Sequence, residues 1–224
     1  REIEVWGADH HGYVPRMRAA VQALGFDPAA FEVILVQLAS VRGGRMSKRE
    51  GRFVTIDELV DAIGSDAARY FYLLRSPDQA MEFDLDLAVR EGSENPVYYA
   101  QYAHARLANV EQRASDRHPA LPEAPDLSLL EQPWELAVLR ELAHWPDVVD
   151  VAVRLREPHR LPPYVHDLAE RVHAFYHEGN RAPEHRVVVD SPDLTRARLE
   201  LARAARNTLR IALSLMGVTA PDRM

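Results

Sequence analysis

One loop of the sequence has the residue types to bind a polyphosphate. Its stretch VRGGRMSKREG, residues 41–51, contains Lys48, the only lysine of the chain, together with Arg45 and Arg49. A compact ammonium can follow phosphate oxygens through a reaction, whereas a guanidinium prefers a fixed planar fork. The flanking glycines allow the backbone positive φ angles and mobility. The loop therefore indicates a triphosphate site, and a solvated basic turn is the alternative.

A second candidate site follows the first predicted strand, in the stretch GADHHGY. Gly7, Asp9 and His10 come directly after the alternating residues EIEVW. Parallel sheets bind ligands outside the carboxyl ends of their strands, which favours a substrate contact here. Adjacent histidines on an extended backbone point to opposite faces, so we predict no metal site. A turn held by its own side-chain hydrogen bonds is the structural alternative.

Three tyrosines in the second half of the chain could stack on unpaired bases. Tyr98 and Tyr102 are four residues apart on a predicted helix and share one face, whereas Tyr99 points elsewhere. Single-stranded RNA is read by such stacking. Because helical tyrosines usually pack in cores, we expect at least one of the three to be buried.

An arginine face is predicted on the last helix. Five arginines and one glutamate lie between residues 194 and 210, a local charge of +4 in a chain whose net charge is −7. The arginines of this face lie opposite apolar positions and suit phosphates; they are Arg196, Arg203, Arg206 and Arg210, opposite Leu194, Leu201, Ala205, Ala212 and Leu215. A solvated face whose arginines pair with carboxylates of neighbouring helices explains the pattern equally well.

The elements that carry these residues change character near residue 90. Residues 2–8 and 31–39 read as strands, and the intervening stretch 16–25 reads as a helix closed by Gly25, which predicts a parallel strand–helix–strand unit. Thr55 is predicted to cap one helix and Ser65 or Asp66 the next, and residues 81–88 alternate like a strand.

From residue 91 onward the pattern predicts a helical bundle. Helices are expected at about 95–115, 132–145, 147–156, 163–178 and 193–217, with prolines at their ends. We therefore predict a mainly α chain with two domains, residues 1–90 and 91–224.

Composition narrows the class of protein. With 224 residues and 47% hydrophobic content the chain can bury a core, and the absence of cysteine excludes disulfides and thiolate metal sites. No apolar run is long enough to span a membrane and no signal peptide is recognised, so we expect no membrane partner and a cytoplasmic location. Because Arg1 is followed at once by a strand pattern, we expect the chain to begin inside a domain.

The stretch from Arg45 to Ser76, RMSKREGRFVTIDELVDAIGSDAARYFYLLRS, resembles the Lys-Met-Ser-Lys-Ser loop of class I aminoacyl-tRNA synthetases and the helices after it. Met46, Ser47 and Lys48 match, whereas Arg45 replaces the first lysine. The resemblance implies that Lys48 stabilises the triphosphate of ATP, with Arg45 and Ser47 in catalytic roles and Met46 in ATP binding. It also implies that residues 1–90 are the carboxyl-terminal portion of a Rossmann-type α/β catalytic domain.

Three further segments resemble the arginyl-tRNA synthetase family: residues 7–25, 93–107 and the ending LMGVTAPDRM. This resemblance implies that arginine, ATP with Mg²⁺ and tRNA are substrates, that no cofactor is tightly bound, and that the protein is a monomer. Gly7, Asp9 and His10 would line the adenylate pocket, and the bundle would bind the anticodon. The tRNA-binding residues expected there are Tyr99, Tyr102, Tyr176, Arg203, Arg206 and Met224.

One signature of class I synthetases, His-x-Gly-His, is not found in this sequence. We therefore expect the 224 residues alone to be inactive and the complete protein to be an arginine–tRNA ligase. Two alternatives stay open: a stand-alone RNA-binding protein derived from a synthetase, and another class I synthetase such as a cysteinyl or methionyl enzyme.

Overall fold

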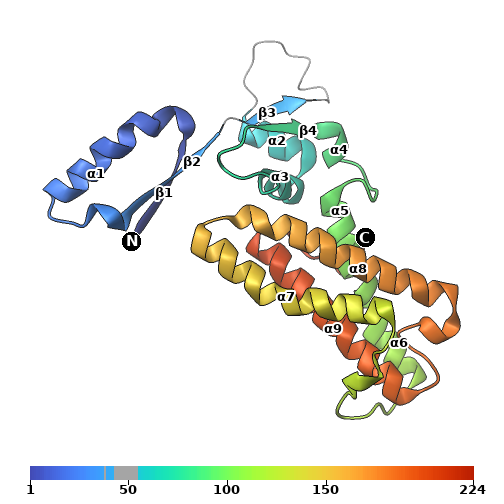
Figure 1. Ribbon diagram of the computed structural model, residues 1–224. Coiled ribbons are helices and arrows are strands. Elements are labelled where there is room, and N and C mark those ends of the chain that lie inside the picture. Colours follow the sequence, from blue (N-terminus) through green and yellow to red (C-terminus); the bar gives the residue numbers. More distant parts are fainter. Residues whose placement is uncertain (38, 43–54) are drawn as a thin grey trace.

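The computed structural model describes residues 1–37, 39–42 and 55–224. The predicted triphosphate loop, with Arg45, Met46, Ser47 and Lys48, lies outside the described residues. The prediction of a mainly α chain is confirmed, since most described residues are helical (Figure 1).

The amino-terminal part is the predicted strand–helix–strand unit. Strand β1 (Glu2–Gly7), the short helix η1 (Ala8–Tyr13) and helix α1 (Val14–Ala23) lead through η2 (Pro28–Ala30) to β2 (Phe31–Val36). The strands pair in parallel, from Glu2 opposite Phe31 to Gly7 opposite Val36. Gly25 follows α1 with a φ of 85°, a left-handed conformation that a side chain would disfavour.

A second pair of parallel strands carries the short helices of the middle segment. Strand β3 (Ala39–Arg42) pairs with β4 (Met81–Asp84), and α2 (Ile56–Ile63) and α3 (Ser65–Tyr72) lie between them in sequence. The predicted cap is confirmed: the Thr55 hydroxyl accepts from the Glu58 amide in a capping box.

Two expectations about this segment are wrong. The strand at 81–88 ends at Asp84, whose carboxylate accepts from the Leu87 amide and starts helix α4 (Leu85–Ala88). A capping carboxylate thus redirects a sequence that alternates like a strand. Neither Ser65 nor Asp66 caps α3, because Gly64 is the residue before the helix and no side chain caps it.

Five helices form the carboxyl-terminal bundle: α5 (Pro96–Ala108), α6 (Val110–Arg117), α7 (Pro133–Leu155), α8 (Leu161–Arg181) and α9 (Pro192–Leu215). Short helices η3 (Leu127–Leu129), η4 (Pro158–Arg160) and η5 (Pro183–His185) lie in the connections. Figure 1 shows α7, α8 and α9 grouped together, with α5 leading from the middle segment into the bundle.

The division of the chain into helices differs from the prediction at two places. Helix α7 runs without a break through Pro146, where the sequence predicted two helices. The proline removes one backbone hydrogen bond, but α7 packs against both α8 and α9, and this packing outweighs that cost. The helix expected at 95–115 is instead divided at Asn109 into α5 and α6.

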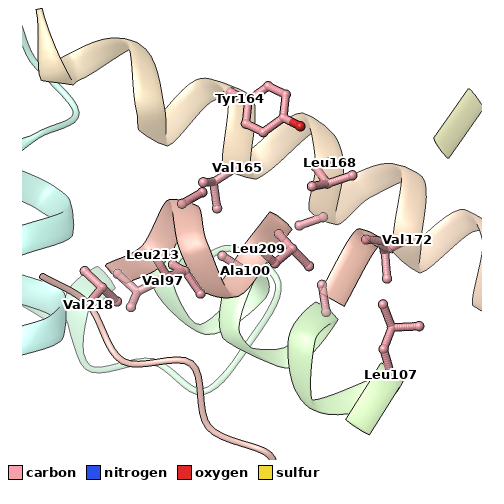
Figure 2. Packing of buried hydrophobic residues seen from close by; sticks show 14 of the residues in the cluster. Val97, Ala100, Leu107, Tyr164, Val165, Leu168, Val172, Leu209, Leu213 and Val218 are labelled. Carbon is pink, nitrogen blue, oxygen red and sulfur yellow. The ribbon is translucent and has the colours of Figure 1, made fainter. Parts of the chain in front are cut away.

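The bundle has one continuous apolar core. Val165, Leu168, Leu209 and Leu213 are all fully buried, and they meet α5 residues such as Ala100 between α8 and α9 (Figure 2). The core extends into the middle segment through Tyr70 and Phe83 and their neighbours. Among the described residues no helix is long and apolar enough to cross a membrane.

Candidate nucleic-acid interface

Tyrosine rings and one guanidinium group line up along one face of α5. The rings of Tyr98 and Tyr102 stack with centroids 5.9 Å apart, and the Arg106 guanidinium lies 4.3 Å from the Tyr102 centroid. The same guanidinium lies 5.2 Å from the Tyr176 ring of α8. We call these four residues the tyrosine–arginine ladder. Each of the three α5 members is four residues from the next, so the helix itself aligns them.

His173 of α8 contacts the ladder through Arg106 and contacts α5 through the Tyr99 backbone. Its Nδ1 accepts from the Arg106 guanidinium at 3.0 Å, and its Nε2 donates to the Tyr99 carbonyl oxygen at 3.0 Å. This arrangement requires a neutral ring with the proton on Nε2. Burial lowers the pKa of His173, and the Arg106 charge acts in the same direction. The neutral His173 ring therefore accepts a hydrogen bond that keeps the Arg106 guanidinium next to the Tyr102 ring.

Acidification should destabilise the chain through two histidines. Burial lowers the pKa of His104 as well as that of His173, so the unfolded chain binds more protons than the folded one below about pH 6.5. We expect the free energy of unfolding to fall as the pH decreases through that value. Urea denaturation at pH 8 and 5.5 measures this. His173→Asn, which cannot titrate, should show a smaller loss, and an equal loss would contradict the role assigned to His173.

A groove of about 590 Å³ continues from the ladder. It lies between α6, α8 and residues 186–188, with Val110, Phe175 and Val188 among its apolar lining and Arg113 and Asn180 among its polar lining. Arg113 donates to the Tyr176 hydroxyl at 3.4 Å, which joins the groove to the ladder. Ring faces, cations and an apolar lining together suit unpaired nucleotides.

The predicted tyrosines divide as their spacing predicts, but the expectation that at least one of the three is buried is wrong, since all three are half-buried. Tyr98 and Tyr102 share a face, whereas the half-buried Tyr99 turns toward α8, with its ring centroid 4.3 Å from that of His173 and 5.2 Å from that of His166. Burial raises the pKa of the Tyr99 hydroxyl. Tyr99 therefore supports the ladder from its inner side, and its predicted contact with RNA stays a prediction.

The predicted arginine face is confirmed as a face, but three of its four cations pair with carboxylates, whereas the exposed Arg210 donates to the Asn207 side chain. Arg203 pairs with Glu111 at 2.7 Å, and Arg206 pairs with Asp222 at 2.7 Å. Similarly, Arg196 pairs with Glu200 at 3.0 Å. Phosphates would have to compete with these carboxylates, so the face offers less free positive charge than the sequence count suggests. Contact of Arg203 and Arg206 with tRNA stays a prediction.

Two residues of α9 differ from their expected environment. Arg198 contributes to the local charge in the sequence, but it is only 2% exposed and pairs with Glu135 of α7. Leu215, expected on the apolar face, is 58% exposed because α9 ends there and the chain turns away. Among the other predicted apolar positions Leu201, Ala205 and Ala212 are buried, and Leu194 is half-buried.

The amino-terminal candidate residues lie where parallel strands end. Gly7 closes β1, and a Cβ at this position would lie 2.5 Å from the Asp9 carboxylate, so a larger residue would require the Asp9 side chain to move. Asp9 and His10 are exposed and 3.7 Å apart. No group of three or more His, Asp or Glu side chains among the described residues could hold a metal ion. An exposed glycine turn with a carboxylate can receive a substrate, and that role stays a prediction.

Several residues of the interface were not identified from the sequence. Arg106 and His173 were missed, although the four-residue spacing from Tyr102 to Arg106 was a usable signal. His173 carried no such signal, because its partners come from another helix. The predicted contact Met224 is 51% exposed at the carboxyl terminus.

Comparison with known proteins connects this geometry to a family. Residues 100–224 match the DALR anticodon binding domain. Over all of its length the chain is 49% identical to the arginine–tRNA ligase of Moorella thermoacetica, and over 99% it is 48% identical to that of Syntrophotalea carbinolica. It spans about 40% of the length of each of these relatives.

Solved structures agree with the sequence comparison. One match is the crystal structure of a Campylobacter jejuni protein described as a proposed arginyl-tRNA synthetase. It covers 99% of the chain with a TM-score of 0.81 and 36% identity, and the match spans 47% of the Campylobacter jejuni protein. Thermus thermophilus arginyl-tRNA synthetase matches 99% of the chain with a TM-score of 0.77 and 24% identity, over 41% of its length, which shows a shared fold. The resemblance to arginyl-tRNA synthetases is thus confirmed, and since the family match covers more than half of the chain, the protein belongs to the DALR anticodon binding domain family.

Proposed function

We propose that the tyrosine–arginine ladder and the adjoining groove bind the anticodon loop of a tRNA. The observation that carries this proposal is the ladder geometry within a DALR anticodon binding domain, with Arg106 between the rings of Tyr102 and Tyr176. Unpaired bases would stack on the tyrosine rings, while Arg106 and Arg113 would meet phosphate or base-edge oxygens. The terminal Met224 would add an apolar contact.

We further propose that the chain forms the carboxyl-terminal part of an arginine–tRNA ligase. In this enzyme ATP and arginine would form an adenylate, and the arginyl group would then pass to the 3′ end of the tRNA. The chain is 48–49% identical to arginine–tRNA ligases over 99% or more of its length, whereas its sequence identity to a methionyl-tRNA synthetase of similar fold is 15%. The identities therefore support an arginine enzyme rather than a methionine enzyme. The complete ligase would be a cytoplasmic monomer without a tightly bound cofactor.

Within that enzyme the amino-terminal part of the chain would bind ATP and the adenylate, and the helical bundle would bind the tRNA. The single ammonium of Lys48 would stabilise the charge on the triphosphate of Mg²⁺-bound ATP, with Arg45, Met46 and Ser47 beside it. Gly7, Asp9 and His10, at the carboxyl end of β1, would line the adenylate pocket. The bundle would position the tRNA by its anticodon. Binding at a remote site can supply the orientation that the chemical step requires.

The proposal is tested with the complete ligase that contains this chain. Labelled arginine should be attached to its tRNA in the presence of ATP, and a tRNA with an altered anticodon should be charged with a higher KM. A complete protein that binds tRNA but charges no amino acid would support the stand-alone RNA-binding alternative. Charging with methionine or cysteine in place of arginine would assign it to another synthetase.

A further inference from the structure

Three segments that are far apart in the sequence meet at the Asp66 carboxylate. Asp66 lies in the first turn of α3, and its Oδ2 accepts from the Gln101 side-chain amide of α5 at 2.9 Å. The same oxygen accepts from the Thr219 hydroxyl, and Oδ1 accepts from the Thr219 backbone amide at 3.2 Å. Gln101 also donates to the Thr219 carbonyl oxygen at 3.0 Å. We call Asp66, Gln101 and Thr219 the tail clamp.

The tail clamp holds the start of the carboxyl-terminal tail, residues 218–224. Gly217 ends α9 with a φ of 69°, and a Cβ there would lie 2.9 Å from an Arg69 guanidinium nitrogen of α3. The chain therefore turns tightly against α3, and Val218 is buried directly after the turn. Figure 1 accordingly places the carboxyl terminus beside α5.

Beyond the clamp the tail has few polar anchors. The Pro221 carbonyl oxygen lies 2.9 Å from His104 Nδ1, and Asp222 pairs with Arg206 at 2.7 Å. Met224 follows two residues later with half of its surface exposed. The position of Met224 therefore depends on the clamp at the start of the tail together with these two contacts.

The clamp also touches the ladder helix. Gln101 lies between Tyr98 and Tyr102 in α5, so the Asp66 carboxylate is bonded both to the tail and to the helix that carries the ladder. Thr219 is exposed and Asp66 is half-buried. Hydrogen bonds at such a rim contribute less to stability than the core beneath them, so the clamp can be changed without unfolding the bundle.

We propose that Asp66 is a positioning residue for RNA binding, which acts by holding the tail and helix α5 in one arrangement relative to α3. The inference rests on the proposed anticodon function. RNA that contacts both the ladder and Met224 would favour the clamped arrangement. Because such coupling is reciprocal, loss of the clamp must weaken RNA binding.

The experiment uses the complete ligase and its tRNA. Asp66→Ala removes all three bonds to the carboxylate and is expected to raise the tRNA dissociation constant by about fivefold or more, the lower range of typical coupling. Thr219→Val should have a smaller effect in the same direction, whereas Thr219→Ser, which keeps the hydroxyl, should bind as the parent does. Asp61→Ala, at an exposed carboxylate of α2, is the matched control and should change nothing.

Steady-state kinetics and a second substitution distinguish a positioning role of Asp66 in RNA binding from a general loss of folded or active protein. At saturating tRNA the kcat of Asp66→Ala should stay within about twofold of the parent while KM rises, as expected for a lost binding contribution. In a Met224→Ala background the effect of Asp66→Ala should be smaller than in the parent, because the part that acts through the tail is already lost. If Asp66→Ala unfolds, Thr219→Val gives the same comparison in a folded protein.

The possible outcomes separate this inference from the function on which it rests. If Arg106→Ala weakens tRNA binding but Asp66→Ala and Thr219→Val bind as Asp61→Ala does, the clamp has no role in RNA binding and the inference is overturned. An undiminished effect of Asp66→Ala in the Met224→Ala background also overturns it. If Arg106→Ala leaves tRNA binding unchanged, the proposed function itself fails.

Discussion

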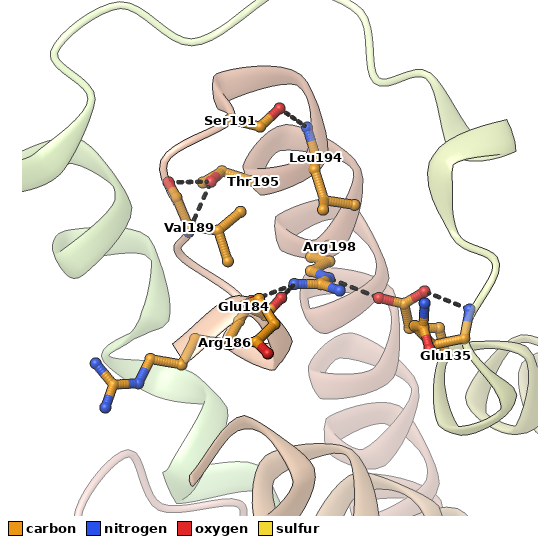
Figure 3. Close-up of polar contacts among 9 residues, drawn as sticks. Glu135, Glu184, Arg186, Val189, Ser191, Leu194, Thr195 and Arg198 are labelled. Carbon is orange, nitrogen blue, oxygen red and sulfur yellow. Dashed lines mark hydrogen bonds and ion pairs between the residues drawn. The ribbon is translucent and has the colours of Figure 1, made fainter. Parts of the chain in front are cut away.

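Replacing Glu135 with alanine is expected to lower the free energy of unfolding by about 3–5 kcal/mol, because it leaves a buried guanidinium without its counter-charge. Glu135 is fully buried and Arg198 is 2% exposed, and the two side chains meet at 2.6 Å. Arg198 also donates to the carbonyl oxygens of Glu184 and Arg186, at 2.6 and 2.7 Å (Figure 3). One arginine thus ties α9 to α7 and to the segment beside the groove.

Urea denaturation of the chain measures this effect, with Glu131→Ala as the control at an exposed carboxylate. Replacing both charged residues, as in Glu135→Leu with Arg198→Met, should be milder than Glu135→Ala alone, since no charge is then left unpaired. A loss below about 1 kcal/mol for Glu135→Ala would show that water or another group compensates Arg198, contrary to our account.

The second large effect is expected at the predicted triphosphate loop. In the complete ligase, Lys48→Ala should slow ATP-dependent activation of arginine by about 10²–10³-fold, the usual result of removing one donor that stabilises transition-state charge. The affinity for tRNA should change little, because the ladder lies in a different part of the chain. Lys48→Arg should recover only part of the rate, since a planar guanidinium cannot follow moving phosphate oxygens as an ammonium does.

Arginine-dependent exchange of pyrophosphate into ATP measures this activation step. An enzyme carrying Lys48→Ala that exchanges as fast as its parent would contradict the assignment of residues 41–51 to a triphosphate. Appreciable exchange by the 224 residues alone would contradict it as well, because the His-x-Gly-His signature is absent from this sequence.

The sequence predicted those features that depend on neighbouring residues. The strand at EIEVW, the Thr55 cap and the burial of Leu201, Ala205 and Ala212 on α9 all depend on residues close in sequence, and the structure confirms them, although Ile3 and Val5 of the strand are exposed. Similarly, the four-residue spacing of Tyr98 and Tyr102 correctly placed their rings on one face. Local geometry alone is enough to predict such features.

The features that the sequence did not predict depend on distant partners. Pro146 ends a helix by local rules, but packing of α7 against α8 and α9 carries the helix through it. Asp66 was predicted as a cap for α3, yet its partners lie 35 and 153 residues away. Arg198 was counted as surface charge because nothing near it in sequence indicates Glu135.

The central claim, that the tyrosine–arginine ladder binds the anticodon, is tested most directly with an anticodon stem-loop RNA. Its dissociation constant should be measured for the complete ligase, for Arg106→Ala and for Tyr102→Ala, with Arg154→Ala of α7 as a matched exposed arginine. Loss of stacking is expected to cost about 1–3 kcal/mol, so each ladder variant should bind about 5- to 150-fold more weakly while the control binds normally. Ladder variants that bind the stem-loop as tightly as Arg154→Ala and the parent would contradict the account.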